Sequence, residues 1–206
     1  MGCMEQFDEL KSSALKELAN VGISHVATAI GEIAREKIDV SVPEFGAFSK
    51  DQLLSIEKPA DGLVGAYLTV DGISELTEAL IILSKKDALG LMDKFVNVDT
   101  IEKVDPANLS VHDQVSIFSE ISTVIAASYF SAVDSMFNLR TNCGVPKVSF
   151  ENGGLIEFIN KTLRQSEGVS VKTSFVSEQS KIQVRVILVP DLKTIDLFFQ
   201  KIGIVS

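Results

Sequence analysis

A short polar pattern occurs twice in the chain at one constant separation, and this repeat limits the possible folds more than any other feature. Three residues of the first half have counterparts 103 residues later: Glu17 and Glu120, Asn20 and Thr123, Pro43 and Pro146. The glutamate and the proline are kept, whereas threonine replaces the asparagine. A chain of 206 residues could form two small domains or one shared core, and we expect two halves that share one sheet.

The periodicity of apolar residues predicts the same order of elements in both halves. Helical spacing from Asp8 to about Glu36 predicts a long first helix, and Ser110 with Asp113 resembles a capping box that opens a second long helix ending near Phe137. Strands are expected at 38–42, 63–70 and 77–83, and again at 145–150, 169–175 and 182–189. Shorter helices are expected at 87–95, 155–163 and 192–202.

This repeated order predicts an α+β fold with layered helices and strands. Tandem helix-plus-three-strand repeats would share one mixed, mainly antiparallel sheet, and the two long helices would pack on it. The polar stretch at 98–110 is too short to be a flexible tether. We therefore expect residues 1–206 to form a single domain of two pseudo-symmetric halves, at about 7–97 and 108–206.

Composition excludes several functional classes. A formal net charge of -9 argues against nucleic acid or an anionic membrane as the main partner, since both attract clustered Lys and Arg. The longest apolar run, Ala79–Leu83, is far shorter than the roughly 20 residues that span a bilayer. Cys3 and Cys143 lack the spacing of a metal site. These features predict a cytoplasmic protein with reduced thiols and without a membrane partner.

Glu17 and Asn20 form the candidate site of the first half. Residues three apart on a helix share one face, with Cβ atoms roughly 5 to 6 Å apart, so a carboxylate and an amide can contact one ligand. Leu18 and Val21 would then face inward. Alone, such a pair is usually an ordinary exposed helix surface, but its repetition and the proline at a fixed distance favour a site.

Small residues surround Asn20 on the predicted helix. Ala19, Gly22 and Ser24 would leave the helix surface open for insertion into a cleft of another protein. Glycine within a helix costs roughly 1 kcal/mol, which calls for a reason. The alternative reason for Gly22 is close packing against a neighbouring element, and the sequence leaves both open.

The spacing of Glu17, two residues, Asn20, twenty-two residues and Pro43 resembles the signature of the CheC group of chemotaxis phosphatases, which includes CheX and FliY. The similarity extends to residues 18–22, 27–30 and 121–132 and to the duplicated layout, so it covers nearly the whole chain. In length the chain is most similar to CheC. The resemblance therefore implies a single CheC-like domain.

The resemblance also implies an activity, which is hydrolysis of the aspartyl phosphate of a CheY-type response regulator. Asn20 would hold the attacking water, and Glu17 would pair with a lysine of the regulator. The regulator would carry the Mg²⁺, so the chain itself needs no metal or cofactor. Thr123 cannot supply the paired donor and acceptor of an amide, so we expect the second site, with Glu120, to be degenerate.

Two further expectations follow from the resemblance. The deamidase CheD is a second expected partner, with Glu151 as an acidic contact beside the helix at 155–163. The alternative function is a CheC-like adaptor that binds a receiver or CheD with weak or no catalysis. A protein unrelated to signalling would require the three equal separations to arise by coincidence.

Overall fold

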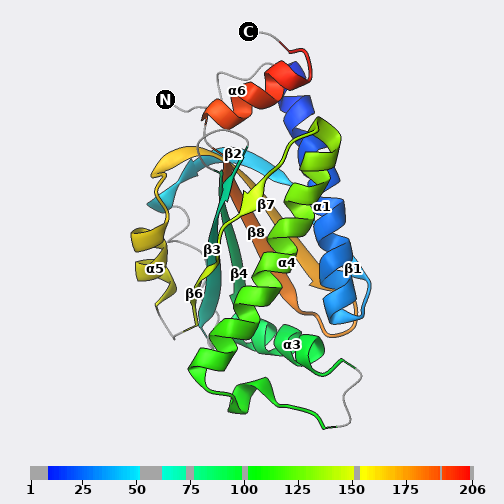
Figure 1. The fold of residues 1–206 in the computed structure, drawn as a ribbon, viewed down its shortest axis with the longest axis vertical. Helices are drawn as coiled ribbons and strands as arrows, with labels where there is room; N and C mark the ends of the chain where they lie inside the picture. The colour runs from blue at the N-terminus through cyan, green and yellow to red at the C-terminus, as the bar shows by residue number, and fades with distance from the viewer. Residues whose placement is uncertain are drawn as a thin grey trace.

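Two long helices, α1 (Glu9–Ala34) and α4 (Val111–Phe137), lie side by side across one face of a single sheet (Figure 1). The computed structural model describes residues 9–51, 62–72, 77–98, 102–150, 154–190 and 192–204. Besides α1 and α4, the described residues contain three shorter helices, whose bounds are given below, and one 3-10 helix, Pro106–Asn108. The two helices expected to carry the candidate sites therefore lie next to each other.

Among the described residues the sheet contains eight strands, with the order β1-β7-β8-β4-β3-β5; β2 also pairs with β7, and β6 with β3. The strands are β1 (Ile38–Val40), β2 (Glu44–Ser49), β3 (Leu63–Asp71), β4 (Thr77–Ser84), β5 (Asn142–Cys143), β6 (Lys147–Ser149), β7 (Glu167–Ser177) and β8 (Gln183–Pro190). Every pairing among the described strands is antiparallel. The predicted α+β fold with a mainly antiparallel sheet is confirmed.

The two halves exchange their short strands. At the centre of the sheet, Ile81 of β4 pairs with Val186 of β8, its counterpart 105 residues later. β1 and β2 of the first half pair with β7, and β5 and β6 of the second half pair with β3. Pro43 and Pro146 each lie between two short strands, where the missing N–H interrupts the hydrogen-bond ladder. Each half thus completes the sheet of the other.

The ends of the long helices also repeat. Arg35 and Asn138, which are 103 residues apart, both have positive φ angles of 55° and 51°. The following N–H groups bond back to Gly31 O and Asp134 O, as in left-handed helix ends. At the start of α4, Ser110 accepts a hydrogen bond from Asp113 N over 3.2 Å, which confirms the expected cap.

The main core lies between the sheet and three helices, α1, α4 and α3 (Lys85–Val96). Leu68 and Ile81 of the sheet and Phe118 and Ile125 of α4 are at most 1% exposed. α4 is long and apolar enough to cross a membrane by length and composition, with 44% of its most apolar window buried inside the structure. Its apolar side therefore packs against the sheet as a core helix does.

The other face of the sheet is covered by α5 (Leu155–Thr162), which packs Leu155 and Ile159 against the strands. The buried carboxylate of Glu78 holds the end of this helix, because it accepts hydrogen bonds from Tyr67 Oη at 2.7 Å and from the N–H groups of Arg164 and Gln165. The helix expected at 155–163 is present, and its apolar side packs against the sheet.

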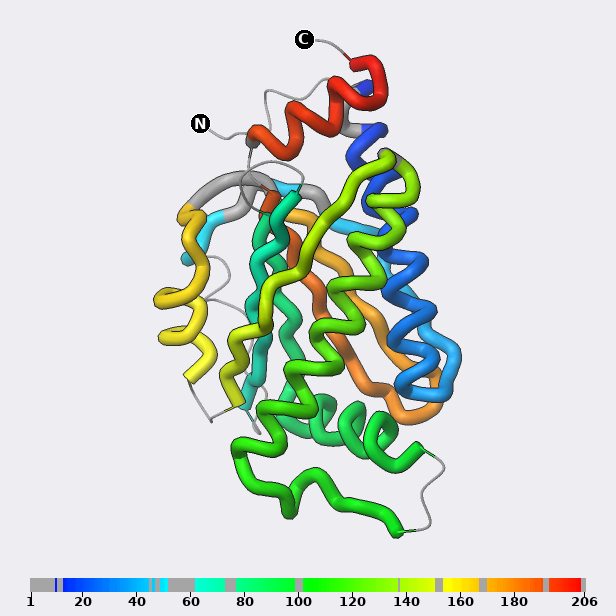
Figure 2. The backbone as a smooth tube through the Cα atoms, in the orientation of Figure 1, coloured from blue at the N-terminus to red at the C-terminus, as the bar shows by residue number. Residues whose placement is uncertain are grey.

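A third cluster joins α6 (Leu192–Lys201) to the N-terminal part of α1. Figure 2 shows α6 lying over this end of α1. Leu15 packs with Ile195, Phe198 and Phe199, all buried. The turn of α1 that follows Leu15 is the one that carries Glu17 and Asn20, so α6 supports it directly.

Two strand predictions need correction. The strand expected at 145–150 is limited to β6, because Val145 is 88% exposed and Pro146 interrupts pairing. β2 was not expected from its sequence, which contains Gly46 and directly follows Pro43; its pairing with β7 creates the strand. The other predicted helices and strands are present with boundaries shifted by a few residues.

Candidate functional site on the paired helices

Glu17 and Asn20 are both exposed on α1. Within the described part of the chain, neither side chain forms a hydrogen bond or an ion pair. Ser24 Oγ donates to the backbone oxygen of Asn20 over 2.8 Å, which leaves the amide of Asn20 unused. Since both side chains are three residues apart on one helix, a carboxylate and an amide are available together to an external partner.

The second pair differs in its hydrogen bonding. Glu120 is exposed on α4, whereas Thr123 is half-buried and its hydroxyl donates to Ser119 O of the same helix over 2.9 Å. This bond to the preceding turn uses the only hydrogen of the hydroxyl. The altered position can therefore still accept a hydrogen bond but cannot donate one without losing its own.

The inward side of the first pair differs from the prediction. Ala19 and Gly22 are buried, whereas Val21 is half-exposed. Of the three small residues expected to leave the surface around Asn20 open, Ser24 is exposed and the other two are not. A Cβ built on Gly22 would lie 2.2 to 2.7 Å from three ring carbons of Tyr129 on α4. Close packing of the helices is thus the reason for this glycine. The sequence does not identify Tyr129 as the partner of Gly22, since the two residues are far apart along the chain.

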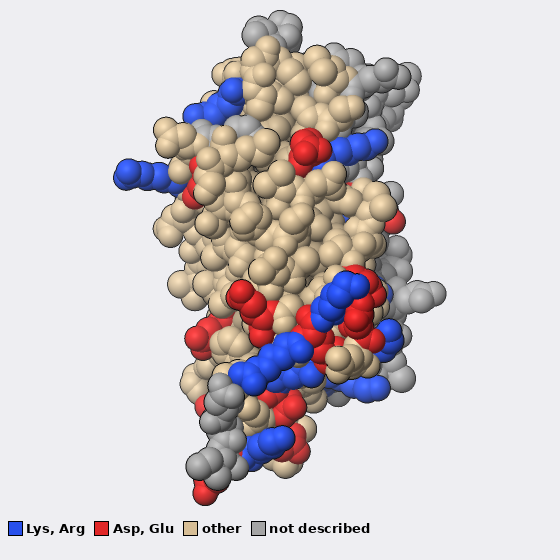
Figure 3. All heavy atoms as spheres, turned by 90° about the vertical axis from the view of Figure 1, so that its right-hand side faces the viewer, with Lys and Arg blue, Asp and Glu red and all other residues tan. Residues whose placement is uncertain are grey.

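An open groove of about 650 Å³ runs between the two helices beside the candidate pairs. Apart from Glu32, its lining consists of small or uncharged side chains: Ser24, His25, Thr28, Ala29, Val124, Ala127, Ser128 and Ser131. Figure 3 shows that a broad central area of the α1 side of the molecule carries few charged side chains, and that most charges gather below it. The surface near the site is suited to close contact with another protein.

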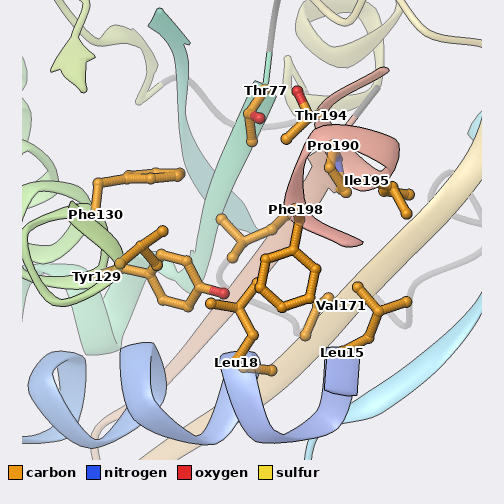
Figure 4. Close-up of a pocket in the computed structure, with 13 residues that line it drawn as sticks. Leu15, Leu18, Thr77, Tyr129, Phe130, Val171, Pro190, Thr194, Ile195 and Phe198 are labelled. Atoms are coloured by element: carbon orange, nitrogen blue, oxygen red, sulfur yellow. The ribbon is translucent and has the colours of Figure 1, made fainter. Parts of the chain in front are cut away.

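A cavity of about 70 Å³ lies behind the turn of α1 that carries Glu17 and Asn20. Figure 4 shows Tyr129 and Phe198 on either side of Leu18, with Thr77 of β4 beyond them. The hydroxyl of Thr77 is buried and has no hydrogen-bond partner among the described residues. Burial raises the pKa of Tyr129, so the phenol group of Tyr129 stays neutral. The supporting side of the site is therefore apolar and incompletely filled.

The remaining predicted residues lie elsewhere. Pro43 and Pro146 are half-exposed between short strands, so they shape the sheet edges. Glu151, the expected contact of CheD, lies outside the described residues. Cys143 is a free, half-buried thiol whose pKa is raised by burial and by Asp134. No group of three His, Cys, Asp or Glu side chains that could hold a metal is found in the described ranges.

Solved structures define the structural class of this chain. FliY from Thermotoga maritima superimposes with a TM-score of 0.66 at 15% identity, covering 96% of this chain and 98% of FliY. CheX from Borrelia burgdorferi, solved as a CheX-CheY-BeF3-Mg complex, gives a TM-score of 0.54 at 12% identity, covering 82% of this chain and 95% of the other. The chain has the fold that CheX and FliY share.

Sequence comparisons support the same relationship. The CheC-like family model matches residues 10–46, the segment that contains Glu17, Asn20 and Pro43. A protein of Bacillus subtilis (strain 168) named CheY-P phosphatase CheC is 24% identical over 212 residues, which cover 98% of this chain and 99% of the relative. The resemblance to the CheC group predicted from the sequence is confirmed.

Proposed function

We propose that this protein hydrolyses the aspartyl phosphate of a CheY-type response regulator, with one dominant site at Glu17 and Asn20. The observation that carries the proposal is the pair of exposed side chains on α1 whose polar groups are free within the described residues. The similarity to a relative named CheY-P phosphatase supports the reaction, and the CheX-CheY complex supports a receiver as partner.

In this proposal the amide of Asn20 positions the water. An amide offers a donor and an acceptor but is a poor base, so it acts by holding water in line with the phosphorus. Glu17 contacts a cationic group of the regulator and fixes the orientation of α1 in its cleft. The regulator carries the Mg²⁺ that stabilises charge on the phosphoryl group. The groove residues between α1 and α4 let the two proteins approach closely.

The test is the dephosphorylation rate of a phosphorylated CheY-like receiver with wild-type protein, Asn20→Ala and Thr123→Ala. We expect a loss of about a hundredfold or more for Asn20→Ala, because removal of one positioned polar group typically has this effect. Thr123→Ala is the matched control at the equivalent position and should change the rate less than about twofold, since its hydroxyl is bound to its own helix. Equal losses from both variants would contradict a dominant site.

Regulation by binding alone is the second candidate, and the bound hydroxyl of Thr123 favours it for the second half. The protein would then bind a receiver, or CheD, without hydrolysis at that helix. α5 presents exposed Glu157, Asn160 and Lys161 on the opposite side of the sheet from α1, and Glu151 precedes it in the sequence. Titration of labelled CheD against wild-type and Glu151→Ala protein tests this surface; unchanged affinity removes Glu151 from it.

A further inference from the structure

A very close contact between α1 and α4 lies two residues beyond Asn20. Gly22 is buried against Tyr129, and a Cβ at this position would lie 2.2 Å from Cε2, 2.4 Å from Cδ2 and 2.7 Å from Cζ of the ring. Real Cβ atoms do not approach other atoms so closely. The backbone of α1 therefore rests directly on the tyrosine ring, and only glycine permits this.

The ring that supports α1 is itself held in place. Tyr129 is 6% exposed and packs edge-to-face on Phe130, with ring centroids 5.1 Å apart and an interplanar angle of 72°. On another side it borders the cavity that Leu18 also lines (Figure 4). An added methyl group at Gly22 must either lift α1 from α4 or push the ring toward that cavity.

We propose that Gly22 and Tyr129 are positioning residues, whose direct contact sets the depth at which α1 lies on α4 and thereby the position of Asn20. A helix is stiff over one turn, and the bond from Ser24 Oγ to Asn20 O spans this turn. A displacement at Gly22 is therefore passed to the amide. Water positioning tolerates errors of only about 0.5 Å, and a 1 Å misplacement can cost a hundredfold in rate.

The contact belongs to the first half alone. The counterparts of Gly22 and Tyr129 by the 103-residue repeat are Ile125 and Val26, and both are buried in the main core. Position 125 carries a branched side chain where glycine would be needed, and Val26 has no ring, so this pair cannot form the same contact. The direct backbone-to-ring contact therefore occurs beside the intact pair and not beside Thr123.

The experiment measures kcat and KM for a phosphorylated CheY-like receiver in four variants. Gly22→Ala should lower kcat about tenfold or more with little change in KM, since the exposed, flexible Glu17 can still reach the regulator. Gly22→Ala with Tyr129→Leu should recover most of the loss, because the smaller side chain makes room for the methyl group. Tyr129→Phe keeps the ring and should retain most of kcat.

Gly31→Ala is the matched control, because it adds the same methyl group to the same helix where the nearest atom is Glu36 O at 3.1 Å rather than α4. It should change kcat less than about twofold. If Gly22→Ala has full activity, or if its loss persists in the double variant although that variant unfolds at the wild-type temperature, the positioning role is wrong.

This inference rests on the proposed function, yet the two can fail separately. A wild-type protein without phosphatase activity would overturn both. An active wild type that loses activity in Asn20→Ala but keeps it in Gly22→Ala would overturn only the positioning role.

Discussion

The turn of α1 that carries Asn20 and the turn of α4 that carries Thr123 occupy equivalent positions in the 103-residue repeat. Their side chains differ on the side that faces solvent and on the side that faces the core. On the outer side, the amide of Asn20 on α1 has no partner among the described residues, whereas Thr123 of α4 bonds to Ser119 O. On the inner side, Ala19 corresponds to Ser122, which is fully buried and whose hydroxyl is unpaired within the described part of the chain. Equivalent turns of the two helices therefore carry side chains of different chemistry.

The packing beneath the turns differs in the same way. Leu15 borders a cavity, whereas its counterpart Phe118 is fully buried and packs on Phe150. Gly22 and Tyr129 correspond to Ile125 and Val26, so one pair joins a very small and a very large residue, whereas the other joins two of intermediate size. Because cores tolerate redistribution of volume when the total is kept, one interface can hold two unlike sites.

Truncation of Leu15 and of its counterpart Phe118 to alanine should give the largest difference between the halves in the free energy of unfolding. Phe118→Ala should lower the free energy of unfolding by about 3 to 5 kcal/mol, as expected for a fully buried aromatic residue. Leu15→Ala should cost about 2 kcal/mol, since this side chain is 9% exposed beside an existing cavity. Urea unfolding measures both. Equal costs would show that the cavity does not loosen the first half.

The C-terminal ends of the helices provide a second comparison. The side chain of Glu36, just after α1, is 3% exposed, whereas the counterpart position after α4 is Leu139. Burial alone would raise the pKa of Glu36, but Lys94 at 2.7 Å and donors from Ser180 and Gln179 hold this pKa well below its usual range. Glu36→Gln should lower the free energy of unfolding by about 2 kcal/mol at pH 7.

The pH dependence tests this assignment of Glu36. A lowered pKa in the folded state means that the carboxylate contributes fully above the unfolded pKa and that this contribution is lost as the pH falls below about 5. Wild-type protein should therefore lose more stability between about pH 5 and 3 than Glu36→Gln. Glu157→Gln, which affects an exposed ion pair with Lys161, is the control and should change the stability much less than Glu36→Gln does, because solvent screens an exposed pair. Parallel pH curves for wild type and Glu36→Gln would disprove the role of Glu36.

The smallest expected effect is a gain of activity at the second site. Thr123→Asn in the Asn20→Ala background should raise the dephosphorylation rate about tenfold, equivalent to about 1.4 kcal/mol, because it restores an amide beside Glu120. Recovery should be partial, since the backbone-to-ring contact is absent at Ile125. A rate unchanged from Asn20→Ala alone would mean that the second turn has lost more than its amide.

Much of the fold follows from local patterns in the sequence. Helical spacing over 8–36 and the cap at Ser110 predicted α1 and α4 closely, because capping and amphipathic periodicity act within a few residues. The separation of 103 residues also predicted related halves, and the positive φ angles of Arg35 and Asn138 extend it to the helix ends. β2 was missed because its pairing with β7 involves residues far away in the sequence.

By itself, then, the sequence determined the two long helices, the repeat and the spacing that puts Glu17 and Asn20 on one helical face. Only the tertiary structure decided that Gly22 is a contact point and that the short strands of each half complete the sheet of the other. It also decided that the Thr123 hydroxyl bonds to its own helix. The physical reason is range: propensities and caps act within a turn or two, whereas close packing depends on side chains that meet only after folding.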